Sequence, residues 1–182
     1  MSLLAATRSE GTKVFSTSTW WILAIVLAAY VGSTAAGLAW LFGAVQAGLV
    51  GADAAGGAPP VAPGALPLTL YSIASSIGYV FPLLIGTLMS TAEFRHGTLT
   101  PTFLATPRRG VALGAKLSAA VLIGAIYGVI ALVAVVTPTA LVFVGFDIDP
   151  ALGQAYTWLF LARSLLALVL LTLVGVGLGA LI

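Results

Sequence analysis

The 182-residue chain has no cysteine and very few charged residues. Without cysteine it can form no disulfide bond, thiolate nucleophile or cysteine-ligated metal site. Charged residues make up 7% of the chain and hydrophobic residues 60%, whereas a soluble domain carries about 25% charged residues. So few charges cannot cover a soluble domain with a hydrated surface, and the composition therefore predicts an integral membrane protein. The net charge of +2 is too small to indicate nucleic-acid binding.

The sequence also lacks the short motifs that carry common enzymatic chemistry. It has no Gly-x4-Gly-Lys-Ser/Thr loop, so any ATP and Mg²⁺ would be bound by another polypeptide. It has no Gly-x-Ser-x-Gly elbow and no His-Glu-x-x-His pair. The one histidine, His96, and the nearby Glu93 are too few ligands for a metal ion. We predict that this chain is not an enzyme and binds no cofactor or metal itself.

Four segments have the roughly 20 mostly apolar residues that a membrane-spanning helix needs. They are residues 20–42, 66–89, 111–136 and 156–182. The predicted fold is therefore all-α, with the whole chain, 1–182, forming one transmembrane domain.

The segments outside these spans are shorter and more polar. Residues 1–19 mix apolar and charged side chains, which suits an amphipathic helix in the membrane interface, although a solvated tail fits the pattern as well. Residues 51–67 are rich in Gly and Pro and are predicted to be a loop. Residues 137–154 are the second connector, and within it 140–146 are apolar enough to dip into the headgroups or to extend the third helix.

The basic residues predict the orientation, because Lys and Arg are enriched on the cytoplasmic side. With a cytoplasmic N-terminus, six of the seven basic residues lie inside or at the inner boundary, namely Arg8, Lys13, Arg95, Arg108, Arg109 and Lys116. Asp53, Asp147 and Asp149 then lie outside. We expect a multi-pass protein of the cell membrane in this orientation.

Polar side chains inside the spans have more than one interpretation each. Arg163 lies about two turns into the fourth span, where it could snorkel to the headgroups, pair with Asp147 or Asp149, or line a translocation path. The second span carries a polar stripe formed by Tyr71, Ser72, Ser75, Ser76 and Tyr79. These serines either bond their own backbone, as is common in membrane helices, or face a substrate.

Residues 91–116 form the one basic island, between the second and third spans. Such a cluster must lie at the membrane surface or in a loop, and we assign residues 90–110 to a cytoplasmic loop. Thr100-Pro101 and Thr106-Pro107 each place an N-cap residue before proline, which predicts a short helix at 101–105 and a new helix from Pro107. The short helix would present Leu99, Phe103 and Leu104 as an apolar face for docking.

The island resembles a loop of known transporters. The run Glu93-Phe94-Arg95-His96-Gly97-Thr98-Leu99, followed by residues 104–109 (LATPRR), looks like the loop after the second helix in permease subunits of the type-2 ABC exporter family. The opening residues 8–21 are similar to the amphipathic helix that leads into that family's first span.

This resemblance implies a permease subunit whose inner loop forms a coupling helix against a separate ATPase subunit. It also implies pairing with a second permease copy or homologue around a central path through the lipid, and export of a hydrophobic or amphipathic substrate. The residues that it assigns to ATPase coupling are Glu93, Arg95, Gly97, Thr98, Leu99, Pro101, Phe103 and Leu104.

Such permeases have six spans, and only four are present here, so we expect the sequence to be a fragment of a six-helix domain. The alternative function is a non-transporting membrane protein, such as a scaffold, assembly or immunity subunit built from four helices. The sequence selects neither a substrate nor a homodimer over a heterodimer.

Overall fold

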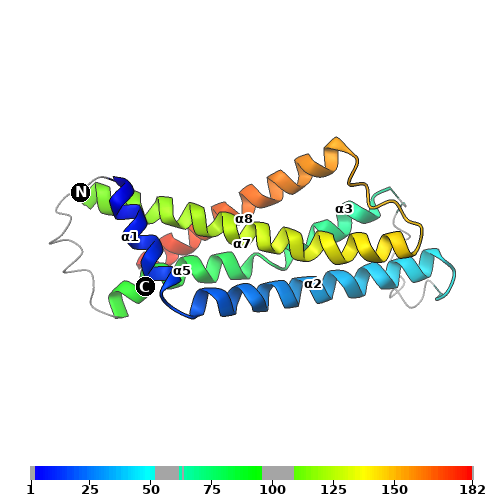
Figure 1. Ribbon diagram of the computed structural model, residues 1–182, viewed down its shortest axis with the longest axis horizontal. Coiled ribbons are helices and arrows are strands. Elements are labelled where there is room, and N and C mark those ends of the chain that lie inside the picture. Colours follow the sequence, from blue (N-terminus) through cyan, green and yellow to red (C-terminus); the bar gives the residue numbers. More distant parts are fainter. Residues whose placement is uncertain (1–2, 52–61, 63, 96–108, 182) are drawn as a thin grey trace. The chain divides into compact units, whose positions relative to one another are not determined.

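The structure of the protein is a computed structural model, and it describes residues 3–51, 62, 64–95 and 109–181. Every regular element in these residues is an α-helix (Figure 1). The helices are α1 (Leu3–Phe15), α2 (Thr19–Gln46), α3 (Leu66–Tyr71), α4 (Ile73–Ser76), α5 (Val80–Arg95), α7 (Arg109–Gly145) and α8 (Ala155–Leu181). The predicted all-α fold class is confirmed.

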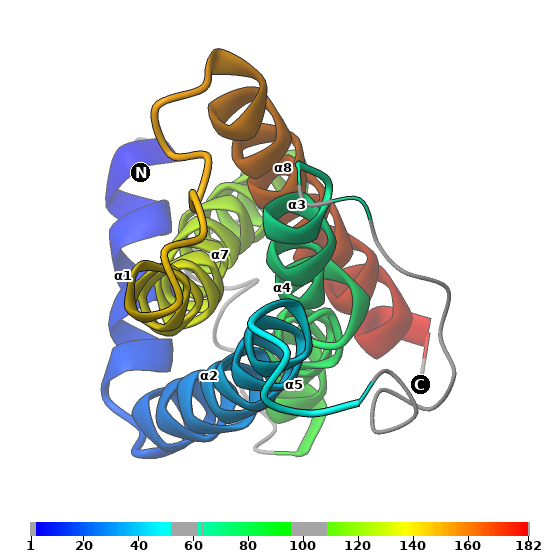
Figure 2. The same cartoon turned by 90° about the vertical axis from the view of Figure 1, so that its right-hand side faces the viewer.

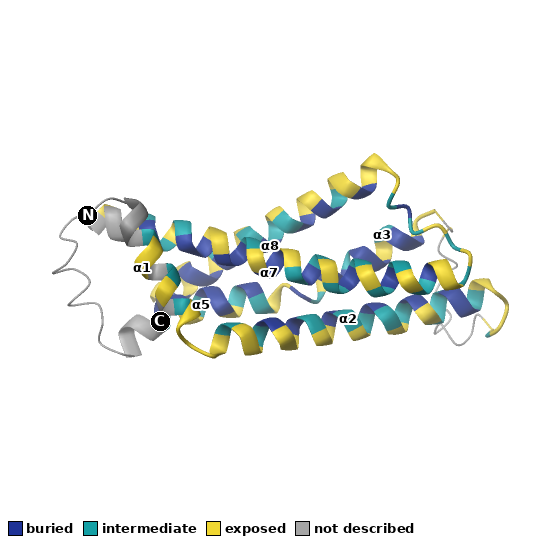
Figure 3. Ribbon diagram, in the orientation of Figure 1, coloured by how far each residue is buried: buried dark blue, intermediate teal, exposed yellow. Residues whose placement is uncertain are grey.

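Four stretches are long and apolar enough to cross a membrane, namely Thr19–Gln46, Leu66–Thr91, Leu113–Gly145 and Ala155–Leu181. Buried and exposed residues alternate with the helical period along α2, α7 and α8 (Figure 3). The exposed faces are apolar too, as Ile25, Tyr30 and Trp40 show on α2. Helices that are hydrophobic all round lie in a membrane or in the core of a large protein, and these four are compatible with a multi-pass membrane protein.

The second span is interrupted, whereas the sequence predicted one helix over residues 66–89. It consists of α3, α4 and α5, with a break at residues 77–79. Pro82 explains the position of this break, because proline has no N–H to donate to the carbonyl four residues earlier and its ring clashes with that carbonyl. That carbonyl belongs to Gly78. A side chain would not fit on residue 78 itself, because a Cβ on Gly78 would overlap the carbonyl oxygen of Ala74.

The third span is longer than predicted. Helix α7 has 37 residues, which is about 55 Å at 1.5 Å per residue and exceeds the roughly 30 Å hydrocarbon core. Residues 140–146 therefore mainly extend this helix, one of the two alternatives that their composition left open. The helix continues through Pro138.

The region before the first span is helical. Helix α1 covers Leu3–Phe15, as the amphipathic-helix alternative required, and a turn at residues 16–18 joins it to α2. The indole N–H of Trp20 donates to the Phe15 carbonyl over 3.2 Å, and the two rings meet edge to face with centroids 5.0 Å apart. These contacts determine the direction in which α1 leaves α2.

The chain divides into two compact units, and each is described separately. Unit 1 comprises Met1–Ile25, Tyr79–Gly128 and Leu166–Ile182, and unit 2 comprises Val26–Gly78 and Val129–Leu165. Unit 1 therefore holds α1, α5, the first part of α7 and the last part of α8. Unit 2 holds most of α2, both α3 and α4, the end of α7 and the start of α8.

Backbone-to-backbone contact dominates the packing of α5 against α8 in unit 1. A Cβ on Gly86 would overlap the Thr172 carbonyl oxygen, and a Cβ on Gly175 would overlap that of Leu83. A Cβ on Gly179 would lie 2.5 Å from the Thr87 carbonyl oxygen. Glycine is required at these positions because any side chain would push the two backbones apart.

Unit 2 is held by larger side chains. Tyr71 and Phe143 are fully buried, and the Tyr71 hydroxyl donates to the Pro150 carbonyl over 2.8 Å. This bond connects α3 to the loop that leads into α8. Figure 2 is viewed from the end of unit 2 at which α3 and this loop lie. A Cβ on Gly43 would lie 2.5 Å from the Phe146 ring, so that ring covers α2 at this point.

Candidate functional site

The predicted coupling loop is described only at its two stems. Helix α5 ends at Arg95 and α7 begins at Arg109, and both stems belong to unit 1. The backbones of Glu93 and Arg95 therefore form the last turn of α5. Six of the predicted coupling residues lie outside the described residues, namely Gly97, Thr98, Leu99, Pro101, Phe103 and Leu104. The predicted short helix at 101–105 also lies outside them.

The α5 stem is attached to α8 close to the loop. Ser90 is 1% exposed, and its hydroxyl donates to the Val176 carbonyl over 2.9 Å. One residue later, the Thr91 hydroxyl donates to the Thr87 carbonyl within α5 over 3.0 Å. Together with the glycine contacts of Gly175 and Gly179, the Ser90 bond holds the part of α5 from Leu83 to Ser90 directly on α8.

The α7 stem is attached to α1 and to the beginning of α2. The hydroxyl oxygens of Thr7 and Ser118 are 2.8 Å apart, which places α1 against the third turn of α7. Further along α7, the buried Tyr127 donates its hydroxyl to the Trp20 carbonyl over 2.6 Å. Both stems of the loop therefore belong to unit 1, each cross-linked by hydrogen bonds to a neighbouring helix.

The serines of the predicted polar stripe bond mainly within their own segment. The Ser72 hydroxyl donates to the Thr69 carbonyl over 2.6 Å, and the Ser75 hydroxyl donates to the Ser72 carbonyl over 3.0 Å. Ser76 is exposed, and Tyr79 is 42% exposed. Ser72, Ser75 and Ser76 lie in unit 2 and Tyr79 in unit 1, and the local bonds of Ser72 and Ser75 agree with a structural role.

Arg163 is exposed on α8 and belongs to unit 2, as do Asp147 and Asp149. No described carboxylate forms an ion pair with it, so pairing with Asp147 or Asp149, one of the alternatives left open by the sequence, is not seen among the described residues. Asp149 instead accepts a hydrogen bond from the Ala151 N–H over 2.8 Å, and both Asp147 and Ala151 have φ of 55°. The carboxylate of Asp149 thus stabilises the turn into α8.

Several buried hydroxyl groups that the sequence reasoning missed organise this architecture. Ser90 and Tyr127 hold the loop stems, and Tyr71, assigned to the polar stripe, is a buried tether. Thr157 donates to the Ala151 carbonyl over 2.7 Å and closes the turn before α8. A hydroxyl group inside a long apolar run was the available sequence signal for such a bond. The signal does not identify the partner, because the partner of Ser90 is 86 residues away along the chain and that of Tyr127 is 107 residues away.

The chain was compared with protein families, characterised proteins and solved structures, and no match was found in any of the three. Function is therefore inferred from the site. The site offers two firmly attached helical stems that carry a basic loop between two membrane spans.

Proposed function

We propose that this chain is the permease subunit of an ATP-driven exporter, energised by a separate ATPase subunit that docks on the loop predicted at residues 91–110. The observation that carries the proposal is the attachment of the α5 stem to α8 through Gly86, Gly175 and the Ser90 hydrogen bond. A coupling loop transmits motion only if its stem moves as a rigid element. Close-packed backbones deform little because no flexible side chain lies between them.

The break at residues 77–79 fits the same mechanism. It separates α5 from α3 and α4, so α5 can change direction there without bending a regular helix. Hinges are commonly a few positions at the ends of elements that absorb changes in φ and ψ. Motion received at the loop would then pass to α5 and α8 while the outer part of the second span keeps its own packing.

The charge distribution supports a cytoplasmic N-terminus and a cytoplasmic loop, as a partner that hydrolyses ATP requires. Four of the seven basic residues lie in residues 91–116, and two more precede the first span. The exposed apolar faces of α2, α7 and α8 suit contact with lipid and with a second permease. A hydrophobic or amphipathic substrate fits these surfaces.

The first experiment places a photo-crosslinking amino acid at Phe103 and irradiates native membranes. We expect a covalent adduct with a polypeptide that contains a phosphate-binding loop. A probe at Leu49, which is 71% exposed after α2, serves as the control and should yield no such adduct. Leu99→Asp and Phe103→Asp should abolish both the adduct and ATP-dependent transport in vesicles.

The proposal fails if the Phe103 probe captures no ATPase while the protein is correctly inserted. Insertion is checked with single cysteines, since the chain has none of its own. Thr98→Cys should react with an impermeant maleimide only after the cytoplasmic side is opened. Labelling of Thr98→Cys from outside intact cells would contradict the orientation, and a correctly oriented chain without an ATPase would favour the scaffold alternative.

A further inference from the structure

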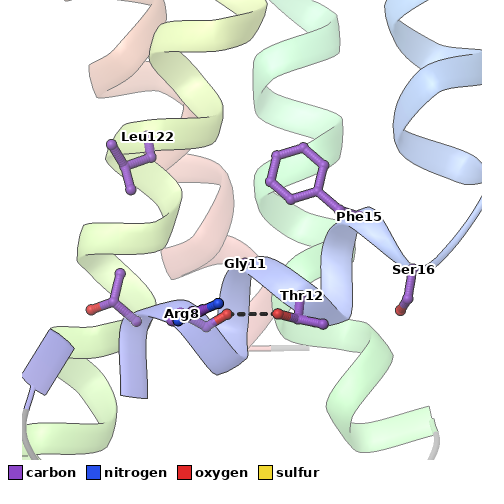
Figure 4. Close-up of a pocket in the computed structure, with 7 residues that line it drawn as sticks. Arg8, Gly11, Thr12, Phe15, Ser16 and Leu122 are labelled. Atoms are coloured by element: carbon purple, nitrogen blue, oxygen red, sulfur yellow. Dashed lines mark hydrogen bonds between the residues drawn. The ribbon is translucent and has the colours of Figure 1, made fainter. Parts of the chain in front are cut away.

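A groove runs along one side of α1 where this helix meets α7 (Figure 4). Its volume is about 640 Å³, and its lining includes Arg8, Gly11, Thr12 and Phe15 of α1 and Leu122 of α7. All of these residues belong to unit 1. The coupling mechanism proposed above does not use this groove.

The groove has a polar level and an apolar level. Thr7 and Ser118 are in hydrogen-bond contact, so α1 lies at the level of Ser118 on α7. Leu122 is four residues further along α7, which is about 6 Å deeper toward the middle of the span. Figure 4 shows Phe15 and Leu122 on the same side of α1, with Arg8 and Thr12 at the level of α1 itself.

The polar level carries a positive charge. The Arg8 side chain is exposed, and no described carboxylate forms an ion pair with it. The Thr12 hydroxyl donates to the Arg8 backbone carbonyl over 2.9 Å. A guanidinium binds phosphate oxygens through two parallel hydrogen bonds, and this geometry favours phosphate over a neutral headgroup.

The apolar level consists of side chains that would otherwise face open space. Leu122 is 59% exposed and Phe15 is 46% exposed, and the Phe15 ring is held in place by Trp20. Gly11 has no neighbouring atom within 4 Å of where a Cβ would be, so the middle of the groove is open. A hydrocarbon chain that covers Phe15 and Leu122 would remove apolar surface from contact with headgroups and water.

We propose that this groove binds an anionic phospholipid, with the phosphate at Arg8 and an acyl chain along Phe15 and Leu122. The charge at the surface level and the apolar wall beneath it match such a lipid in both order and spacing. The site would anchor α1 in the leaflet next to the loop stems. It is independent of the proposed transport function, because a scaffold protein with the same α1 would bind the lipid equally.

The test uses protein in nanodiscs of mixed phosphatidylglycerol and phosphatidylcholine, with the retained lipids identified by native mass spectrometry. We expect the wild-type chain to retain phosphatidylglycerol preferentially. Arg8→Gln should lower this preference about fivefold, as expected for one basic residue at a membrane surface. Arg163→Gln removes the same charge from an exposed position in unit 2 and should leave the preference unchanged.

Gly11→Leu tests the groove without changing charge. The new side chain would fill the open middle, and the exchange favours helix formation in α1. We expect loss of the retained phosphatidylglycerol with an unchanged circular dichroism spectrum. In a chain whose other tryptophans are replaced by Phe, brominated phosphatidylglycerol should quench Trp20 more than brominated phosphatidylcholine does, and Gly11→Leu should remove this difference.

Three results would overturn the proposal. One is an equal loss of preference in Arg8→Gln and Arg163→Gln, which would mean unspecific attraction to charge. Another is full retention of phosphatidylglycerol by folded Gly11→Leu. The third is crosslinking of Gly11→Cys to a second polypeptide in native membranes, because a protein segment would then occupy the groove.

Discussion

Glycines allow close packing in both units, but what lies opposite the glycine differs. In unit 1, Gly86 and Gly175 face carbonyl groups of the neighbouring helix. In unit 2, Gly43 faces the ring of Phe146, which can rotate about its own side-chain bonds. The backbone cannot move aside without shifting a whole helix, whereas a ring can. Gly86 and Gly175 of unit 1 are therefore more sensitive to added volume than Gly43 of unit 2.

The largest effect is expected for Gly175→Ala. The added methyl group meets the Leu83 carbonyl and should lower the free energy of unfolding by about 3 kcal/mol. The measurement is thermal unfolding in detergent by circular dichroism. Gly177→Ala is the matched control in the same helix, because nothing lies within 4 Å of a Cβ there. Equal unfolding temperatures for the two variants would contradict the backbone contact between α5 and α8.

A smaller effect is expected for Tyr71→Phe in unit 2. The exchange removes the hydrogen bond to the Pro150 carbonyl and should lower the free energy of unfolding by about 1.5 kcal/mol. Tyr156→Phe is the control, since Tyr156 is 49% exposed. Hydrogen exchange in residues 146–154 should rise in Tyr71→Phe alone. An unchanged exchange rate in that loop would show that the tether does not hold it.

Gly43→Ala should cost less than Gly175→Ala, although the unrelaxed Cβ would lie only 2.5 Å from the Phe146 ring. The ring can move, and we expect a loss of about 1 kcal/mol in the free energy of unfolding. The double variant Gly43→Ala/Phe146→Leu should regain part of this loss, because a smaller side chain leaves room for the methyl group. A loss as large as that of Gly175→Ala would remove the distinction between a glycine that faces a carbonyl and one that faces a ring.

The smallest effect, and the only gain, is expected at Thr139 in α7. Its hydroxyl oxygen is buried, and no described residue forms a hydrogen bond with it. Thr139→Val keeps the shape and removes the unsatisfied polar atom, so the free energy of unfolding should rise by about 0.5 kcal/mol. Thr172→Val is the comparison, because the Thr172 hydroxyl donates to the Leu168 carbonyl over 3.1 Å. Destabilisation by Thr139→Val would indicate a partner for that hydroxyl in the membrane.

Two prolines inside the membrane spans, Pro82 and Pro138, show where sequence reasoning reached its limit. Both lack an N–H, yet Pro82 accompanies a break and Pro138 lies inside a continuous helix. Pro138 leaves the Ala134 carbonyl without its usual intrahelical donor. That carbonyl faces Gly32 of α2, where a Cβ would lie 3.1 Å from the oxygen. A neighbouring glycine thus makes room for the freed carbonyl, and no local pattern could have indicated which glycine it would be.

The helix before the first span was one of two alternatives that the sequence left open, and the predicted basic loop lies largely outside the described residues. Composition and periodicity were sufficient to predict the all-α class and the four spans, since each follows from local hydrophobicity over about 20 residues. They did not reveal that Ser90 bonds to Val176, that Tyr127 bonds to Trp20, or that the groove beside Arg8 continues to Leu122. These contacts join residues from distant parts of the chain. Their positions follow from how the helices pack against one another, and packing depends on the fit of whole surfaces.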